Sequence, residues 1–87
     1  MTRDEAVAFL AQPMTRERAI EFSAASGWHL LTLTERFVLQ IQGDYMFMPF
    51  SVMHEAAEIV LRRPVYVSEF TTDGCALLLA EHLRNQN

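Results

Sequence analysis

The sequence predicts a small helix-rich α+β domain, with four or five helices around a minimal two-stranded sheet. Three observations support this class. Threonines stand where helices would begin, two short segments are rich in apolar and β-branched residues, and 87 residues are too few for two domains. We therefore expect one domain, with a helical pair over residues 1–27, an α-β-α-β-α unit over 28–84 and a frayed tail over 85–87.

Capping signals predict two helices in the first thirty residues. Thr2 and Glu5 have the spacing of a capping box, in which each side chain binds the backbone N–H group of the other residue. Thr15 is placed to cap a second helix that runs to about residue 25. Gly27 follows that helix, and we expect it to adopt the left-handed backbone that ends many helices.

Residues 28–42 fit two different structures. Thr32 and Glu35 form a second capping box, which predicts a helix over residues 34–42 that Gly43 stops. Apolar and polar residues also alternate along much of this segment, which is typical of a half-buried strand. The pattern of the residues alone leaves both structures open.

The two expected strands lie on either side of a helix. Tyr45–Phe50 is a continuous apolar run too short for a helix, so we expect a strand whose end Pro49 places at a sheet edge. Val65–Phe70 is rich in β-branched and aromatic residues and forms the second expected strand. Between the strands, Ser51 is placed to cap a helix that Pro64 ends.

A last helix is expected near the C-terminus. Thr72 or Asp73 is placed to cap it, and apolar residues recur at helical spacing up to about Leu83. This spacing turns Leu79 and Leu83 toward the core. Cys75 lies on the same helix, and we expect a buried structural thiol because the chain has no second cysteine for a disulfide.

Residues 31–70 carry several short motifs in a fixed order. A Thr-Leu pair opens the first helix of this segment, Phe-Ser-x-x-His-Glu opens the second, and Arg-Pro-Val and Glu-Phe mark the second strand. In these motifs the segment resembles a family of small uncharacterised phage and prophage proteins. The matching positions are Thr32, Leu33, Phe50, Ser51, His54, Glu55, Glu58, Leu61, Arg63, Pro64, Val65, Glu69 and Phe70.

The resemblance implies a phage or prophage setting, and it favours a helix over residues 34–42, which we adopt. Two positions depart from the family pattern. Arg62 stands where the family has Gly at the end of a helix, and Ser68 stands where it has His. An arginine in left-handed backbone costs about 1 kcal/mol relative to glycine. The missing histidine weakens a metal-site interpretation of the segment.

Four polar residues form the strongest candidate for a chemical site. His54 and Glu58 lie four positions apart on one expected helix. The other two are Glu55, beside them, and Glu69 on the following strand. Such a set can hold a divalent metal or transfer protons, but the same spacing continues to Arg62 and is typical of a solvated charge ladder. We favour the ladder and expect no catalytic residue, metal or cofactor.

The first expected strand and Tyr66 supply a candidate surface for a partner protein. Aromatic residues and methionine are favoured at adaptable interfaces, and an exposed strand edge can pair with the sheet of a partner. The candidate residues are Tyr45, Met46, Phe47, Met48, Phe50 and Tyr66.

The composition argues against several classes of protein. A net charge of −4 and a pI near 5.2 do not suit a nucleic-acid footprint, which is usually basic. No apolar run approaches the roughly 20 residues of a membrane span. Hydrophobic residues make up 51% of the chain, so we expect a partner surface or a homodimer to cover part of them. With its single cysteine, the protein is expected in a reducing cytoplasm, and the resemblance implies the cytoplasm of a bacterial host.

These observations and the resemblance predict a non-catalytic phage or prophage protein that binds a bacterial host protein and inhibits or modulates it. Inhibition of a defence system such as CRISPR–Cas is the most concrete version. The alternative is a small DNA-binding transcriptional regulator, for which Arg16 and Arg18 on the second expected helix are the support. The long spacer after that helix argues against a helix-turn-helix.

Overall fold

The chain folds from helices alone, which corrects the predicted α+β class. The computed structural model describes residues 1–86, and no strand forms within that range. Its α-helices are α1 (Arg3–Leu10), α2 (Arg16–Ala24), α3 (Leu33–Gln42), α4 (Phe50–Leu61) and α5 (Thr72–Asn85), with two 3-10 helices, η1 (Gly27–Leu30) and η2 (Val67–Glu69).

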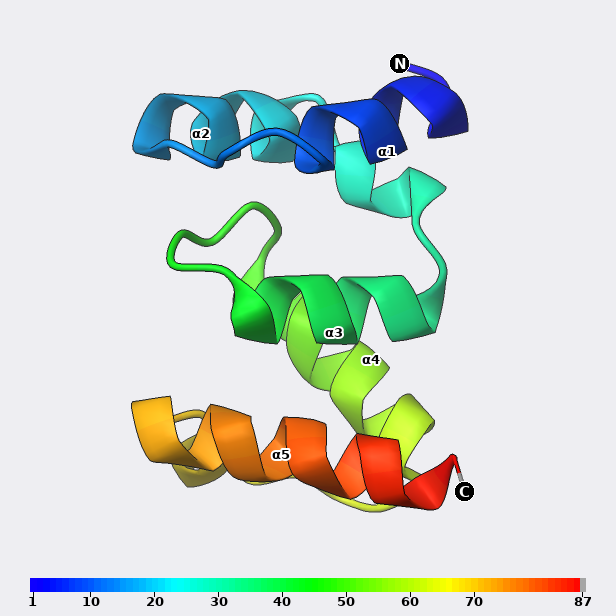
Figure 1. Cartoon of the computed structure of the whole chain (residues 1–87), viewed down its shortest axis with the longest axis vertical. Coiled ribbons are helices and arrows are strands. Elements are labelled where there is room, and N and C mark those ends of the chain that lie inside the picture. The colour runs from blue at the N-terminus through cyan, green and yellow to red at the C-terminus, as the bar shows by residue number, and fades with distance from the viewer. Residues whose placement is uncertain (87) are drawn as a thin grey trace.

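Helix α3 lies in the middle of the molecule, as Figure 1 shows. Helices α1, α2 and η1 form a layer on one side of α3, while α5 lies on the opposite side. Helix α4 crosses α3 and leads the chain toward α5. As a result α3 lies between two helices, α1 and α5, that run roughly alongside it.

Two clusters of buried side chains form the core. The first joins the N-terminal layer to the segment before α4, and the second joins α3, α4 and α5. Ile41 and Phe70 pack against both clusters. The buried members are Ala6, Ala19, Phe22, Leu31, Phe47, Met48 and Met53 in the first cluster, and Phe37, Ala56, Ala57, Leu61, Val65 and Leu78 in the second.

The predicted threonine caps form. In the first capping box the N–H of Glu5 donates to Thr2 Oγ1 at 3.2 Å, and in the second the N–H of Glu35 donates to Thr32 Oγ1 at 3.1 Å. Thr15 caps α2 in the same way, at 3.2 Å. The second box confirms the helix, rather than the alternating strand, at residues 34–42.

Two helix starts and the C-terminal tail differ from their predicted positions. Pro49, not Ser51, is the N-cap of α4, because its φ of −58° already suits entry into a helix. Thr71 caps α5, one residue before the predicted range, by accepting the N–H of Gly74 at 2.9 Å. The expected frayed tail begins inside α5, which ends at Asn85, and residue 87 lies outside the described residues.

The predicted strand Tyr45–Phe50 is instead a loop that leads into α4. Phe47 and Met48 are consecutive and both buried, whereas neighbouring residues of a strand face opposite sides. Gln40 of α3 supplies the hydrogen bonds that a sheet would provide. Its amide donates to the carbonyl of Tyr45 at 3.0 Å, and its side-chain oxygen accepts the N–H of Phe47 at 2.9 Å. The buried glutamine therefore makes the backbone hydrogen bonds that a neighbouring strand would make in a sheet.

The predicted second strand, Val65–Phe70, forms the turn of η2. Val65 is buried, but Tyr66 and Val67 are 70% and 65% exposed, so no sheet covers this segment. The Glu69 carboxylate accepts the N–H of Tyr66 at 2.8 Å, and the N–H of Glu69 donates to the carbonyl of Tyr66 at 2.9 Å. These local bonds close a single helical turn and outweigh the β propensity of valine.

Two residues other than glycine adopt left-handed backbone within residues 1–86. Ser26, not Gly27, holds it after α2, with a φ of 53°. Gly27 is required for space, because a Cβ there would lie 2.6 Å from the ring of Phe22. Arg62 holds left-handed backbone at the end of α4, with a φ of 58°, so the helix ends there without a glycine.

Candidate functional site

The six residues predicted to contact a partner separate into two groups. Two of them, Phe47 and Met48, lie in the core, where a partner cannot reach them. Because the segment is a loop, it also lacks the strand edge that was expected to pair with a partner's sheet. The exposed members are Tyr45, Met46, Phe50 and Tyr66, with exposed fractions of 44%, 47%, 38% and 70%.

A hollow of about 230 Å³ lies beside the loop of residues 43–46. In its wall, Phe50 packs edge-on against Phe70 with ring centroids 5.2 Å apart, and Cys75 of α5 lies nearby. Burial raises the pKa of the Cys75 thiol, so little thiolate is present at neutral pH. This thiol therefore has the character of a structural side chain rather than of a nucleophile.

His54 and Glu58 together hold the backbone of Val65. Glu58 Oε2 accepts the N–H of Val65 at 3.0 Å, and the His54 ring donates from Nε2 to the carbonyl of the same residue. Nε2 of His54 also lies 3.8 Å from Glu58 Oε2. Arg62, the expected third member of a ladder, bonds to neither side chain in the described chain. The pair is a clamp on the turn that follows α4.

The other two acidic candidates lie apart from this clamp. Glu55 is exposed, while Glu69 and Glu81 each bind the guanidinium of Arg63 at 2.9 Å. Hydrogen bonds from Arg63 hold the pKa of both of these carboxylates below the usual range. The resulting hub ties the end of α4 to η2 and α5. Within residues 1–86 no group of three His, Cys, Asp or Glu side chains is placed to hold a metal.

Many of the positions that match the phage-like family meet in this turn. The clamp on Val65 consists entirely of matching positions, and so does the hub at Arg63 apart from Glu81. Ser68, which departs from the family, is exposed on η2. These residues of the segment 31–70 therefore hold the turn after α4.

Arg18, one of the two arginines considered for DNA contact, is bound to the protein itself. Its guanidinium lies 3.8 Å from the centroid of the Phe9 ring and donates to the Phe9 carbonyl at 2.6 Å. Arg16 is then the exposed arginine of α2. A single exposed arginine on a helix offers little to a phosphate backbone.

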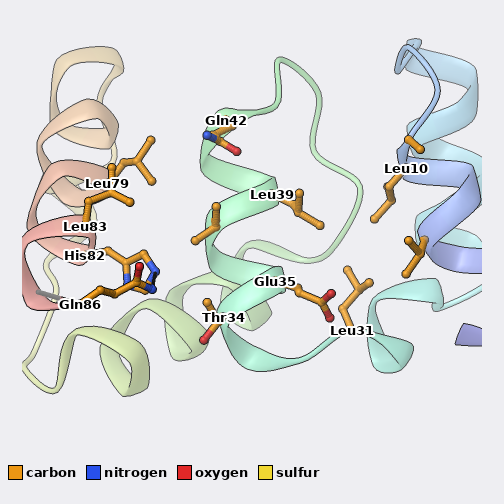
Figure 2. A pocket seen from close by; sticks show the side chains of 13 residues that line it. Leu10, Leu31, Thr34, Glu35, Leu39, Gln42, Leu79, His82, Leu83 and Gln86 are labelled. Atoms are coloured by element: carbon orange, nitrogen blue, oxygen red, sulfur yellow. Dashed lines mark hydrogen bonds between the residues drawn. The ribbon is translucent and has the colours of Figure 1, made fainter.

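An apolar groove of about 590 Å³ runs along the outer side of α3, between α1 and α5. Figure 2 shows Leu79 and Leu83 of α5 pointing toward α3. On the other side, Leu39 of α3 points toward Leu10 of α1. The thirteen residues that line the groove are Val7, Leu10, Ala11, Leu31, Thr34, Glu35, Val38, Leu39, Gln42, Leu79, His82, Leu83 and Gln86.

The groove exists because α3 is apolar on two sides. Phe37 and Ile41 pack in the core, Val38 lies between the core and the groove, and Leu39 lines the groove with 37% of its surface exposed. Since α1 and α5 lie on opposite sides of α3, neither of them covers this second apolar stripe. The stripe is the floor of the groove, and the two flanking helices are its walls.

Helix α5 turns a different face to the core than the sequence predicts. Leu78 and His82 are its buried residues, while Leu79 is half-buried and Leu83 is 54% exposed. Leu79 and Leu83, expected to face the core, therefore face the groove. The packing of α5 against α3 and α4 places Leu78, rather than Leu79, in the second core cluster.

An ion pair lies at the Leu31 end of the groove. The guanidinium of Arg3 donates to both carboxylate oxygens of Glu35, at 2.8 and 3.0 Å, and to the carbonyl of Leu30 at 2.9 Å. The bonds from Arg3 and from the N–H of Thr32 lower the pKa of Glu35 to about 2. The carboxylate is thus charged at neutral pH and neutralised by its partner, and it links the N-terminal layer to α3.

Of the other polar side chains of the groove, His82 and Gln86 pair with each other, whereas Thr34 and Gln42 are exposed and form no side-chain hydrogen bond among the described residues. The amide nitrogen of Gln86 lies 3.0 Å from Nε2 of His82 and donates a hydrogen bond to it. The His82 ring packs edge-on against Phe37, with centroids 5.8 Å apart. The groove therefore presents aliphatic surface to whatever enters it, with few polar groups directed outward.

No known protein family, curated protein or solved structure matches this chain. The resemblance to phage proteins stays a prediction, and the groove is interpreted from its own chemistry. No helix within residues 1–86 is both long and apolar enough to cross a membrane.

The groove residues were not among the predicted site residues, although two signals in the sequence bear on them. Hydrophobic residues make up 51% of the chain, and the segment 33–42 carries more apolar side chains than one buried helix face can use. Both signals indicate uncovered apolar surface. Neither shows which helices flank it, because that depends on long-range packing.

Proposed function

We propose that the protein acts by binding another protein, with the groove between α1, α3 and α5 as the binding surface. The observation that carries this proposal is the groove itself. It has a volume of about 590 Å³ and a largely aliphatic lining, on a chain of only 87 residues. Small proteins rarely leave apolar surface of this kind uncovered unless it serves an interaction.

The energetic contribution of the groove comes from its half-exposed aliphatic side chains. Val7, Leu39 and Leu83 are 43%, 37% and 54% exposed, so they have the most apolar surface to lose on binding. Each square ångström removed from water contributes roughly 25 cal/mol. These three side chains, one from each helix of the groove, are the expected anchors of the contact.

The proposed activity is non-catalytic. The titratable groups of the groove, Glu35 and His82, are bound to Arg3 and Gln86 and hold helices in place. The resemblance to phage and prophage proteins favours a bacterial protein as the partner, inhibited or modulated by the contact.

A matched pair of variants on α5 tests the proposal. Leu83→Arg places a charge in the groove, whereas Leu77→Arg makes the same change at a 70% exposed leucine that lines a different hollow. Tagged wild type and both variants are crosslinked in bacterial lysate and compared by quantitative mass spectrometry. We expect one partner in near-stoichiometric yield with wild type and Leu77→Arg, and its loss with Leu83→Arg.

Two results would contradict the proposal. Retention of the partner by Leu83→Arg would move the contact away from the groove, and Met46→Arg would then test the exposed group around Tyr45. Recovery of nucleic acid without a protein partner would favour the DNA-binding alternative. Circular dichroism of each variant shows that the fold is retained, which exposed sites such as these are expected to allow.

A further inference from the structure

We infer that the occupant of the groove is a single amphipathic helix of about three turns, contributed by a different protein. This inference rests on the proposed function and names the shape and chemistry of the partner segment. It is carried by the length of the groove, by the small number of residues that line it, and by the distribution of charge around it.

The length of the groove suits a short helix. Helix α3, its floor, has 10 residues and is about 15 Å long, and α5, one wall, has 14 residues and is about 21 Å long. Both walls run roughly alongside α3 (Figures 1 and 2). A helix of 10–14 residues laid along α3 would contact all three helices with side chains at i, i+3 or i+4, and i+7.

The polar groups of the groove argue against a small polar ligand. Sites for such ligands direct a few polar groups at the ligand to fix its orientation. Here Glu35 is bound to Arg3 and Thr32, and His82 is bound to Gln86. What the groove offers is aliphatic contact along its length, which the apolar stripe of a helix can match.

The number of lining residues argues against a second copy of this chain. A stable interface between two globular proteins uses about 20–30 residues on each side, whereas thirteen line this groove. A homodimer built on the groove alone would therefore bury too little surface to be stable. A single helix needs only the groove, because its apolar stripe is narrow.

The lining of the groove carries little charge, whereas the protein as a whole is acidic. Apart from His82, the one acidic or basic side chain that lines the groove in the described chain is Glu35, and Arg3 neutralises it. The contacting face of the partner helix is therefore expected to be uncharged. The whole chain carries a net charge of −4, so basic residues on the outer face of the helix would speed association.

The test uses the full chain and a yeast-displayed library of random 14-residue peptides. The library is selected on wild type and on Leu77→Arg, and is depleted on Leu83→Arg. Enriched peptides are synthesised, and their binding is measured by surface plasmon resonance at two salt concentrations. Circular dichroism reports their helicity, and amide NMR shifts of the labelled protein locate their contact. Leu39→Arg provides a second groove variant.

We expect the enriched peptides to share apolar residues at helical spacing and to become helical when bound. Their affinity should fall about tenfold or more with Leu83→Arg and Leu39→Arg, and change less than about twofold with Leu77→Arg. Added salt should lower the association rate of basic peptides and leave the dissociation rate nearly unchanged.

Three outcomes would overturn the inference. The first is the absence of enriched peptides, and the second is enriched peptides that bind without helical structure or outside the groove. The third is self-association of wild type that Leu83→Arg abolishes, which would make the groove a contact between copies. If the lysate experiment yields a groove-dependent partner while no helical peptide is selected, this inference fails and the proposed function stands.

Discussion

Arg62 shows how a single backbone angle shapes the end of a helix. Its φ of 58° lies in the region that glycine enters without penalty and that a Cβ disfavours. Its side chain is exposed and forms no hydrogen bond or ion pair in the described chain, so nothing visible compensates for that strain. The residue therefore lowers the free energy of unfolding.

Replacing Arg62 by glycine should stabilise the protein. The expected gain is about 1 kcal/mol, or a rise in Tm of about 4–8 °C for a domain of this size. Chemical and thermal denaturation of Arg62→Gly, compared with wild type, measure it. Arg62→Ala is the control, because it removes the charge but keeps the Cβ, and it should bring no comparable gain. A lower Tm for Arg62→Gly would refute this explanation.

Gly74 is required for a different reason, the close approach of a backbone carbonyl. A Cβ at residue 74 would lie 1.9 Å from the carbonyl oxygen of Glu69, so Gly74→Ala must push α5 away from η2. We expect a loss of about 1–3 kcal/mol in urea denaturation. Gly43→Ala is the matched control, since its Cβ would meet nothing closer than 3.4 Å, and it should be nearly neutral.

Among the structural elements, the turn after α4 depends most on individual side chains. Glu58 and His54 hold the N–H and carbonyl of Val65, and Arg63 binds the carboxylates of η2 and α5. Because Val65 is buried, its backbone groups need these partners. The turn is therefore held by side chains of α4 rather than by the β-sheet that its sequence suggests.

Removing the Glu58 carboxylate should weaken this turn. Glu58→Ala leaves the N–H of Val65 without a partner, and we expect a loss of about 1 kcal/mol in chemical denaturation. Glu55→Ala, three residues earlier on the same helix, is the control, because Glu55 is exposed and forms no bond among the described residues. Equal effects of the two variants would argue against the clamp, and a rise in Tm with added zinc would show that the cluster binds metal.

The elements differ in how well local sequence predicts them. The capping boxes at Thr2 and Thr32 were correct because a cap depends on residues three positions apart. The two strands were wrong because side chains of the preceding helix bind their backbone, Gln40 of α3 in one case and the clamp on Val65 in the other. In both segments, partners from another element override the intrinsic β propensity of the residues.

At the scale of the whole molecule, the Arg3–Glu35 pair connects the N-terminal layer to the centre of the fold. The two side chains are separated by 32 positions in the sequence and form a bidentate ion pair at 2.8 and 3.0 Å. The rest of this connection is the first core cluster around Phe22 and Phe47, together with a hydrogen bond from Arg36 of α3 to the carbonyl of Trp28 at 2.9 Å. The ion pair adds a pH-dependent link to this contact.

The stability should fall in acid in a way that depends on Glu35. Because its pKa is lowered from 4.5 to about 2 in the folded protein, its stabilising contribution is complete above the unfolded value and disappears as the pH falls toward 2. Glu35→Gln keeps a side-chain oxygen for the cap on Thr32 but lacks the charge. Urea denaturation of both proteins between pH 6 and pH 2.5 should show their difference shrinking.

Glu55→Gln provides the control for this titration, because Glu55 is exposed and forms no bond among the described residues, so the substitution removes no ion pair. Glu69 and Glu81 also have lowered pKa values, so the total acid sensitivity of wild type includes them as well. The measured quantity is therefore the difference between wild type and Glu35→Gln. A difference that stays constant with pH would contradict the role of the ion pair.

The groove also belongs to the scale of the whole molecule, and for this reason the sequence could not locate it. Its lining comes from three helices and from residues that are up to 79 positions apart, Val7 and Gln86. The excess of apolar residues indicated that a surface stays uncovered, but it suggested the Tyr45–Phe50 segment as readily as α3. Only the packing of α1 and α5 on opposite sides of α3 separates these two candidates.

Cys75 allows one local motion of the protein to be measured without introducing a cysteine by mutation. It lies in the wall of the hollow beside residues 43–46, and burial raises the pKa of its thiol. A water-soluble thiol reagent should therefore react slowly, at a rate set by how often that loop lifts away from α5. The reaction rate, divided by the rate for the unfolded chain, gives the equilibrium constant for this local opening. The natural cysteine thus serves as a probe of local opening at one edge of the core.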